Sequence, residues 1–495
     1  MASGTARRAR ATRQCGWFTA TLLGLLAPVI GCAPAWAHAS DKGVVLLLPT
    51  QYYIVGGTLA VAASFLLLLV APDTWLRRIA AAQLNLGIWP AIPSAATSTI
   101  TFTLLILLVI TGWYGSRDPL ENPLPLFIWT LWWGGLTIAH ALLGNLWSFL
   151  NPWLAPYRLI RRLSGTAIPS SAPLTYPAWL GYLPAILFLL GFAWFELIDP
   201  APDDPAVLAL AVAIYSAITL TGMLLFGERA WLARAECFSV FFGFVALLAP
   251  LQAGSAEPAP STGSSSRYRP SLGLPGRALL QRQPLPLDGM CFVLLTLATV
   301  SFDGLNKTFW WLGLWGVNPL EFPGRTALML PNSLGLVGAW LLLCSAYGLA
   351  MALGVRLAGG RIALETSLGA FVLSILPISI GYHFAHYLTS FLVNAQYAVF
   401  SINDPFEWEW HLLGIEAPHV MVSFLSDMNS VWVIFTLQAG AVVLVHILAV
   451  LLAHLIAIER FPDKPAAFAS QWPLAALMVG YTLFGLWLLA APTIG

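Results

Sequence analysis

The sequence predicts an all-α, polytopic helical membrane protein with about ten transmembrane helices after a cleaved signal peptide. Only 9% of the 495 residues are charged, the mean hydropathy is +0.78, and long apolar runs alternate with short charged segments. A bilayer core of about 30 Å needs about 20 apolar residues of helix. Ten runs reach this length, and they begin near Gln51, Thr97, Leu124, Pro177, Ala206, Asp288, Pro331, Ser367, Asn429 and Trp472.

Residues 1–37 have the three parts of an export signal. Arginines within residues 7–13 precede an apolar stretch at 17–31, and Ala35-Trp36-Ala37 is a small-x-small cleavage site. Cleavage there makes His38 the first residue of the mature chain. The segment that ends at Cys32 also resembles a lipobox, which would leave a lipidated cysteine at the N-terminus instead.

Lys and Arg residues are concentrated in every second gap between the apolar runs. With His38 exported, fifteen fall inside and four outside, which is the positive-inside bias. We therefore expect a multi-pass protein of the bacterial inner (cytoplasmic) membrane with both mature termini in the periplasm. The fifteen are Arg77, Arg78, Arg158, Arg161, Arg162, Arg229, Arg234, Arg267, Arg269, Arg277, Arg282, Arg356, Arg361, Arg460 and Lys464, and the four are Lys42, Arg117, Lys307 and Arg325.

A segment rich in Pro, Gly and Ser at residues 253–287 divides the apolar runs into five and five. Such a composition is typical of a flexible linker, here a cytoplasmic one. The first membrane half is residues 38–252, and the second is residues 288–495 with a periplasmic loop at 401–428. The run at 237–252 is short for a span and precedes an arginine-bearing segment, so we expect it to be interfacial or re-entrant.

Histidines within the spans are the first candidates for a functional site, because ionisable groups inside a membrane are costly. His383 and His386 are three residues apart on one helical face, and His446 lies at a similar depth on the next span. Three imidazoles with an open position are typical of a site for zinc, copper or another divalent transition metal. Two alternatives stay open, namely interhelical hydrogen bonds and a proton relay.

Further polar residues within the spans are secondary candidates. His140 and His454 lie nearer the cytoplasmic ends of their spans, where we expect structural or interfacial roles. Asp303 closes the sixth span and Glu196 closes the fourth. Asp303 is the better candidate, either as a further metal ligand or as a carboxylate that orients a histidine, although it could simply pair with Lys307.

A second group of candidates lies in the expected periplasmic loop. Glu407, Glu409 and His411 alternate, so an extended segment would place all three on one side and the intervening tryptophans on the other. Together with an N-terminal His38 they could form a separate metal site. The alternative is a solvated acidic loop whose tryptophans lie in the interfacial belt.

Several function classes lack support in the sequence. It contains no Walker A loop, no GxGxxG after a strand, no GxSxG elbow and no HExxH motif. No nucleic-acid motif or basic arm is present, so we expect no nucleic-acid partner. The cysteines of the mature chain suggest neither a disulfide framework nor a CxxC metal site; they are Cys237, Cys291 and Cys344.

A set of short strings runs through most of the mature chain. They are Asn122-Pro123-Leu124-Pro125, Leu146-Trp147-Ser148-Phe149-Leu150-Asn151-Pro152-Trp153, Trp194-Phe195-Glu196-Leu197, Phe302-Asp303-Gly304-Leu305, Ala385-His386-Tyr387, His446 and Ala453-His454. As a set they resemble the bacterial integral membrane proteins known as fenitrothion hydrolases. The linker at 253–287 and the acidic loop match that family less well.

The resemblance implies hydrolysis of an organophosphorus triester to a nitrophenol and a dialkyl thiophosphate. Such substrates are neutral and apolar, so they partition into membrane lipid and could enter a site laterally from the bilayer. An aromatic pocket for the leaving aryl group would include Tyr382 and Tyr387. Hydrolysis also requires an activated water and a positive centre that stabilises the developing charge.

The mechanism that we expect from the sequence uses a metal hydroxide held by His383 or His386 together with His446. Asp303 would assist, and the hydroxide would attack phosphorus opposite the aryloxide. Without a metal, a histidine would act as the general base. The competing class is a metal-ion or proton-coupled transport or metal-handling membrane protein that uses the same histidines, and a third is a structural partner in an envelope complex.

Overall fold

The computed structural model describes residues 45, 47–90, 92–164, 172–252, 267–321, 324–415, 419–461 and 463–493, so the predicted signal peptide, Cys32 and His38 lie outside the described residues. Within those ranges the chain is almost entirely helical, and ten helices are long and apolar enough to cross a membrane. The predicted all-α, multi-pass membrane architecture is confirmed. These ten spans are Thr50–Val70, Ser94–Tyr114, Pro123–Leu143, Ala178–Leu197, Pro205–Phe226, Leu287–Asn306, Arg325–Leu357, Leu364–Asn403, Met428–Arg460 and Lys464–Ala490.

Eight spans begin within three residues of the predicted starts, and the seventh and tenth begin earlier. Helix α17 starts at Arg325 and contains Pro331, and helix α21 starts at Lys464 and contains Pro473. From the sequence, both prolines are expected near the first turn of their helices, where the missing N–H of proline removes no hydrogen bond. In both helices the chain instead remains helical on the N-terminal side of the proline, as membrane helices tolerate.

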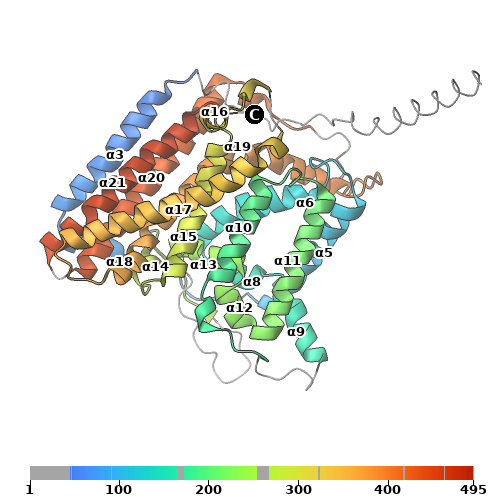
Figure 1. Cartoon of the computed structure of the whole chain (residues 1–495). Helices are drawn as coiled ribbons and strands as arrows, with labels where there is room; N and C mark the ends of the chain where they lie inside the picture. The colour runs from blue at the N-terminus through green and yellow to red at the C-terminus, as the bar shows by residue number, and fades with distance from the viewer. Residues whose placement is uncertain are drawn as a thin grey trace, which may run out of the picture. The chain divides into compact units, whose positions relative to one another are not determined.

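The first membrane helix packs against the last two. Helix α3 (Thr50–Val70) lies beside α20 (Met428–Arg460) and α21 (Lys464–Ala490), as the blue and red ribbons of Figure 1 show. A hydrogen bond of 3.0 Å between the hydroxyl groups of Tyr53 and Thr436 joins α3 to α20. Helix α17 (Arg325–Leu357) packs on the same group through α21.

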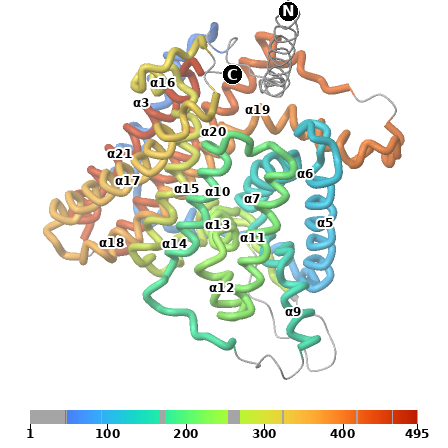
Figure 2. The backbone as a smooth tube through the Cα atoms, turned by 45° about the vertical axis from the view of Figure 1, so that its right-hand side comes forward, coloured from blue at the N-terminus to red at the C-terminus, as the bar shows by residue number. Residues whose placement is uncertain are grey.

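The most buried spans occupy the middle of the bundle. Of the residues in their apolar windows, 72% are buried in α15 (Leu287–Asn306) and 89% in the span at Leu364–Asn403, against 11% in α3. The latter span is broken into α18 (Leu364–Phe371), the 3-10 turn Val372–Ile375 and α19 (Leu376–Asn403). Figure 2 shows α15 beside α10 (Leu183–Leu197), which it contacts.

The third span is not a regular α-helix. It consists of α6 (Pro123–Pro125), the π-helix η2 (Leu126–Leu136) and α7 (Thr137–Leu143). π-Helices are rare and occur frequently at functional sites. Since η2 packs directly against α19, this unusual segment lies next to the span that carries His383 and His386.

The run at 237–252 forms a short buried helix. Helix α13 (Cys237–Val245) has seven buried residues and meets α12 (Glu228–Arg234) at a bend of 66°. The Glu236 carboxylate caps α13 by accepting hydrogen bonds from the N–H groups of Phe238 and Ser239. A purely interfacial position does not fit this burial, whereas a re-entrant or broken span does.

Part of the expected linker is ordered. Residues 253–266 lie outside the described residues, but from Arg267 the chain forms strands β4 (Arg267–Tyr268) and β5 (Ser271–Gly273). Strand β5 pairs with β1 (Gln83–Asn85) and β3 (Leu251–Gln252), and β4 pairs with β2 (Trp89–Pro90), all antiparallel. The second half of the segment is therefore no free linker, because backbone pairing attaches it to the loop after α4 (Asp73–Ala81).

The remaining described elements are two further membrane spans, α5 and α11, and the short helices between spans. They are α4 (Asp73–Ala81), α5 (Ser94–Tyr114), α8 (Trp147–Leu150), α9 (Leu154–Leu163), η3 (Ala178–Leu180), α11 (Pro205–Phe226), η4 (Ala246–Leu248), α14 (Arg277–Leu280), α16 (Phe309–Leu314), η5 (Pro319–Glu321) and η7 (Ser423–Leu425).

Candidate functional site

The side chains of Asp303 and His386 are in direct contact inside the bundle. The Nε2 atom of His386 on α19 lies 2.6 Å from Oδ2 of Asp303 on α15. One turn after Asp303, the Nζ atom of Lys307 lies 2.9 Å from the other carboxylate oxygen. The Asp303 side chain is only 3% exposed, whereas His386 is 25% and Lys307 44% exposed. A buried carboxylate thus has one basic side chain at each oxygen.

Tyr387 connects a second carboxylate to this region. Its hydroxyl group donates a hydrogen bond to Oε1 of Glu196 on α10 and accepts one of 3.0 Å from Nε1 of Trp133 on η2. Because His386 and Tyr387 are adjacent on α19, side chains of one turn of this helix contact the carboxyl groups of both Asp303 and Glu196. The sequence analysis ranked Glu196 below Asp303 and proposed no role for Trp133.

His383 faces the π-helix. Its Nε2 atom lies 2.9 Å from the carbonyl oxygen of Trp133, and its ring packs at 5.1 Å against the Trp133 ring and at 4.5 Å against Tyr387. Since a carbonyl oxygen only accepts, Nε2 carries the proton and donates. This nitrogen is therefore unavailable as a metal ligand while the contact to η2 persists.

A small cavity lies between these side chains. Its volume is about 10 Å³, which is room for about one water molecule. The walls come from η2, α10, α13, α15 and α19, and most of them are apolar. The polar residues that line it are Glu196, Asp303, His383, Tyr387, Thr296, Thr299 and Ser379.

The three histidines predicted as joint metal ligands do not come together. Within the described ranges, no three His, Cys, Asp or Glu side chains form a group that could hold a metal ion. His383 donates to η2, His386 contacts Asp303, and Nδ1 of His446 lies 2.7 Å from the Val442 carbonyl oxygen. The residues therefore do not fit the expected three-histidine site, and we derive no step through a metal.

His446 and Tyr382 belong to a separate buried group. Their ring centroids are 5.9 Å apart, and the Tyr382 hydroxyl group donates a hydrogen bond of 2.6 Å to the carbonyl oxygen of Tyr481 on α21. The Tyr481 hydroxyl group lies 2.7 Å from Oγ of Ser301. Of the two tyrosines expected in a substrate pocket, Tyr387 lines the cavity and Tyr382 does not.

The two remaining membrane histidines make structural contacts. In His140, Nδ1 lies 2.7 Å from the Leu136 carbonyl oxygen and Nε2 accepts a hydrogen bond of 2.9 Å from the Trp147 N–H. In His454, Nδ1 lies 3.0 Å from Oε1 of Gln471, and Nε2 is buried without a hydrogen-bond partner among the described residues. Neither histidine lines the cavity.

The loop after α19 does not have the extended backbone on which the predicted separation of acidic and aromatic side chains depends. Glu407, Glu409 and His411 have positive φ values of 57°, 59° and 50°, and the intervening rings of Trp408 and Trp410 pack together at 5.0 Å. Positive φ is uncommon for residues other than glycine. The three polar side chains do not form a metal-binding group with other described residues.

A neighbouring acidic residue contacts this loop. Glu121 lies between α5 and α6, and its pKa is raised, chiefly by burial and also by the nearby Asp118 and Glu407 carboxylates. A hydrogen bond from Ser116 acts in the opposite direction. Loss of a proton from Glu121 as the pH rises therefore adds a negative charge next to Glu407 and weakens this loop contact.

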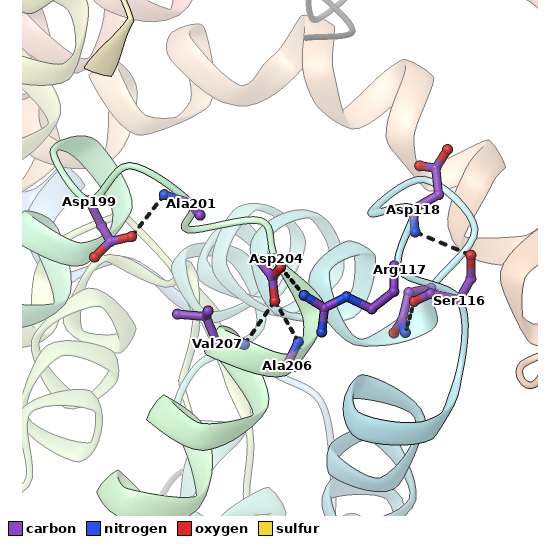
Figure 3. A network of polar contacts seen from close by, with 9 residues as sticks. Ser116, Arg117, Asp118, Asp199, Ala201, Asp204, Ala206 and Val207 are labelled. Carbon is purple, nitrogen blue, oxygen red and sulfur yellow. Dashed lines mark hydrogen bonds and ion pairs between the residues drawn. The ribbon is translucent and has the colours of Figure 1, made fainter. Parts of the chain in front are cut away.

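Charged residues between the spans hold helix ends together. In Figure 3 the Arg117 guanidinium group pairs with Asp204, whose carboxylate also accepts hydrogen bonds from the N–H groups of Ala206 and Val207 at the start of α11. Asp118 in the same loop accepts from Leu120. This network positions α5 against α11 and contributes no side chain to the cavity.

No protein-family model matches the chain, and neither a curated protein nor a solved structure is significantly similar to it. The function must therefore be argued from the geometry of the site.

Proposed function

We propose that the chain is a membrane-embedded hydrolase of neutral, apolar phosphotriesters such as fenitrothion. The observation that carries this proposal is the contact of 2.6 Å between the imidazole of His386 and the buried carboxylate of Asp303. A carboxylate that holds one imidazole nitrogen leaves the other nitrogen free as a general base. The resemblance of strings such as Ala385-His386-Tyr387 to fenitrothion hydrolases supports the same reaction.

In the proposed mechanism His386 activates water. Asp303 holds the Nε2–H group, so Nδ1 takes a proton from a water molecule as the water oxygen attacks phosphorus. The P–O bond to the aryl group breaks, the aryloxide leaves, and the proton on His386 is then released to it or to solvent. Asp303 stabilises the imidazolium ion during the reaction, and Lys307 supplies the positive charge nearest to the developing negative charge.

The substrate binds outside the small cavity in this proposal. A cavity of about 10 Å³ admits one water molecule but no triester. His386 is 25% exposed and Lys307 is 44% exposed, so both reach the bundle surface beside the buried carboxylate. An apolar substrate dissolved in lipid would meet the site there, with membrane lipid as the surrounding solvent.

We also propose the membrane in which the protein lies and its orientation there. Fifteen Lys and Arg residues in one set of gaps against four in the other favour the bacterial inner membrane with both mature termini in the periplasm. In that orientation Asp303 and Glu196, which lie near the C-terminal ends of α15 and α10, face the periplasmic half of the bilayer.

Nitrophenol release from fenitrothion by the detergent-purified full chain tests the proposal. We expect activity in the natural protein and a loss of about 10²- to 10⁴-fold in His386→Ala. His419→Ala, in an exposed position of the loop before α20, is the matched control and should keep full activity. Release at an equal rate by His386→Ala would contradict the proposal.

A second candidate function, proton-coupled or metal-ion transport, has support from α20. The Nδ1 atoms of His446 and His454 contact acceptor oxygens, which leaves the Nε2 lone pairs buried and without partners among the described residues. The Gln471 amide nitrogen donates to the Ala467 carbonyl oxygen, so its Oε1 must accept from His454. Two buried lone pairs on one helix are suited to accept protons in turn.

Vesicle measurements separate the two candidates. Purified protein in liposomes with a pH-sensitive dye inside should show no substrate-independent proton or metal-ion flux if the chain is only a hydrolase. Flux that disappears in His446→Leu, together with no nitrophenol release, would favour transport instead.

A further inference from the structure

The cavity is lined by two carboxyl groups, those of Asp303 and Glu196. The Asp303 carboxylate has two basic neighbours, His386 at 2.6 Å and Lys307 at 2.9 Å. Like charges close together in a medium of low dielectric constant do not both stay ionised unless each has a compensating cation. The charge state of each carboxyl group therefore depends on whether a cation lies next to it.

In the part of the chain that the structure describes, no basic side chain pairs with the Glu196 carboxyl group. Among the described residues, the Tyr387 hydroxyl group is the one hydrogen-bond donor to its carboxyl group, and Trp133 fixes that hydroxyl group from the other side. The guanidinium group of Arg325, the nearest arginine on α17, donates instead to the backbone carbonyl oxygens of Glu196 and Asp199.

The other charged groups around Glu196 compensate its charge only in part. Lys307 on the α15 side acts on Glu196 but is engaged with Asp303, and both Asp303 and Asp203, in the loop before α11, add negative charge. On α19, His383 donates to the Trp133 carbonyl oxygen and His386 faces Asp303. The environment of Glu196 thus contains more negative than positive charge that is free to act on it.

We infer that Glu196 is a proton-binding site that carries its proton at neutral pH, next to a cavity with room for about one water molecule. The neutral acid accepts the Tyr387 hydrogen bond at Oε1 and can donate its own proton to that water. This inference does not depend on the hydrolase proposal, because it follows from the arrangement of charges alone. If the hydrolase proposal also holds, the acid Glu196 and the base His386 belong to one network of polar residues.

Infrared spectroscopy of the purified full chain at neutral pH tests the inference. A protonated carboxyl group has a C=O stretching band above the amide I band, whereas exposed carboxylates contribute none there. We expect a band in the natural protein that is lost in Glu196→Gln and kept in Glu321→Gln, a control in the short helix η5. The difference spectrum also removes any signal from Glu236, which is buried elsewhere.

A second variant keeps the test decisive if Glu196→Gln does not fold. Tyr387→Phe removes the hydrogen-bond donor, so the band should move to higher frequency. The inference is overturned if the natural protein has no such band, if the band survives in Glu196→Gln, or if Tyr387→Phe leaves its frequency unchanged. Because none of these spectra requires turnover, failure here is distinguishable from failure of the proposed hydrolase.

Discussion

At the scale of single residues, Lys307 supports the site through the buried carboxylate of Asp303. Asp303 is 3% exposed and Lys307 lies 2.9 Å from it, so the two charges offset each other. The second carboxylate oxygen lies 2.6 Å from Nε2 of His386 and holds this imidazole in place. Without Lys307, the buried carboxylate would lose its compensating cation, which is costly.

Replacement of Lys307 by Met should therefore lower triester hydrolysis roughly tenfold, because the buried carboxylate that holds His386 loses its compensating charge. Lys307→Arg preserves the charge and should retain most of the activity. Hydrolysis rates of the natural protein and of both variants, each corrected for its folded fraction, provide the measurement. Equal rates for all three would show that Lys307 does not support the site.

His140 gives the contrasting case of a buried histidine with both ring nitrogens satisfied. We expect His140→Ala to lower the free energy of unfolding by about 1–3 kcal/mol, because the Trp147 N–H loses its acceptor. The hydrolysis rate per folded molecule should not change. Thermal unfolding in detergent, combined with the specific activity of the folded fraction, separates the two effects. A stable but inactive variant would give His140 a role that its contacts do not suggest.

The candidate site was predictable in part from particular residues. Asp303 and His386 are identifiable because each is an ionisable residue in an apolar run. A role for Asp303 in orienting a histidine was predicted, but which histidine it contacts depends on the relative rotation and depth of α15 and α19. Depth alone suggested that His446 joins His386, but its position on α20 directs it to Tyr382.

At the scale of elements, hydropathy predicts the spans but not their internal irregularities. The third span contains the π-helix η2, and the eighth is broken by a 3-10 turn at Val372–Ile375. Hydropathy depends on side chains and not on the backbone hydrogen-bond pattern, so neither feature is visible in it. For the same reason the Trp133 carbonyl oxygen could not be foreseen as the partner of His383.

Two glycines of α17 allow a test of how closely this helix packs against α21. A Cβ atom at Gly354 would lie 2.3 Å from the Ser470 carbonyl oxygen, whereas one at Gly348 would meet nothing within 4 Å. Gly354→Ala should destabilise the protein by about 1–3 kcal/mol, since the backbone of α21 must move. Gly348→Ala should not destabilise it. Equal unfolding temperatures for both variants in detergent would contradict the close α17 and α21 contact.

At the scale of the whole molecule, charge distribution and span number together predict the orientation. Ten spans place the loop between α19 and α20 on the side opposite to the loop between α17 and α18. The positive-inside bias assigns the former to the periplasm. The described structure does not contradict this alternation of sides. Separately, the ordered strands at Arg267–Gly273 show that composition alone overestimated the length of the flexible linker.

Thiol labelling tests this orientation. In a chain without its native cysteines, Gly414→Cys lies in the expected periplasmic loop and Gly360→Cys in the expected cytoplasmic one. A membrane-impermeant maleimide added to intact cells should label Gly414→Cys and leave Gly360→Cys unlabelled until the cells are lysed. The reverse pattern would invert the topology and place the Asp303 site in the cytoplasmic half.

The most direct test of the central claim, that Asp303 and His386 act as one general-base unit, is a double-mutant cycle on fenitrothion hydrolysis. Rates are measured for the natural protein, Asp303→Asn, His386→Ala and the double variant, each corrected for its folded fraction. Residues that act as a unit are strongly non-additive. We predict that the double variant is no slower than His386→Ala alone. Losses that multiply, or single variants with undiminished rates, would contradict the account.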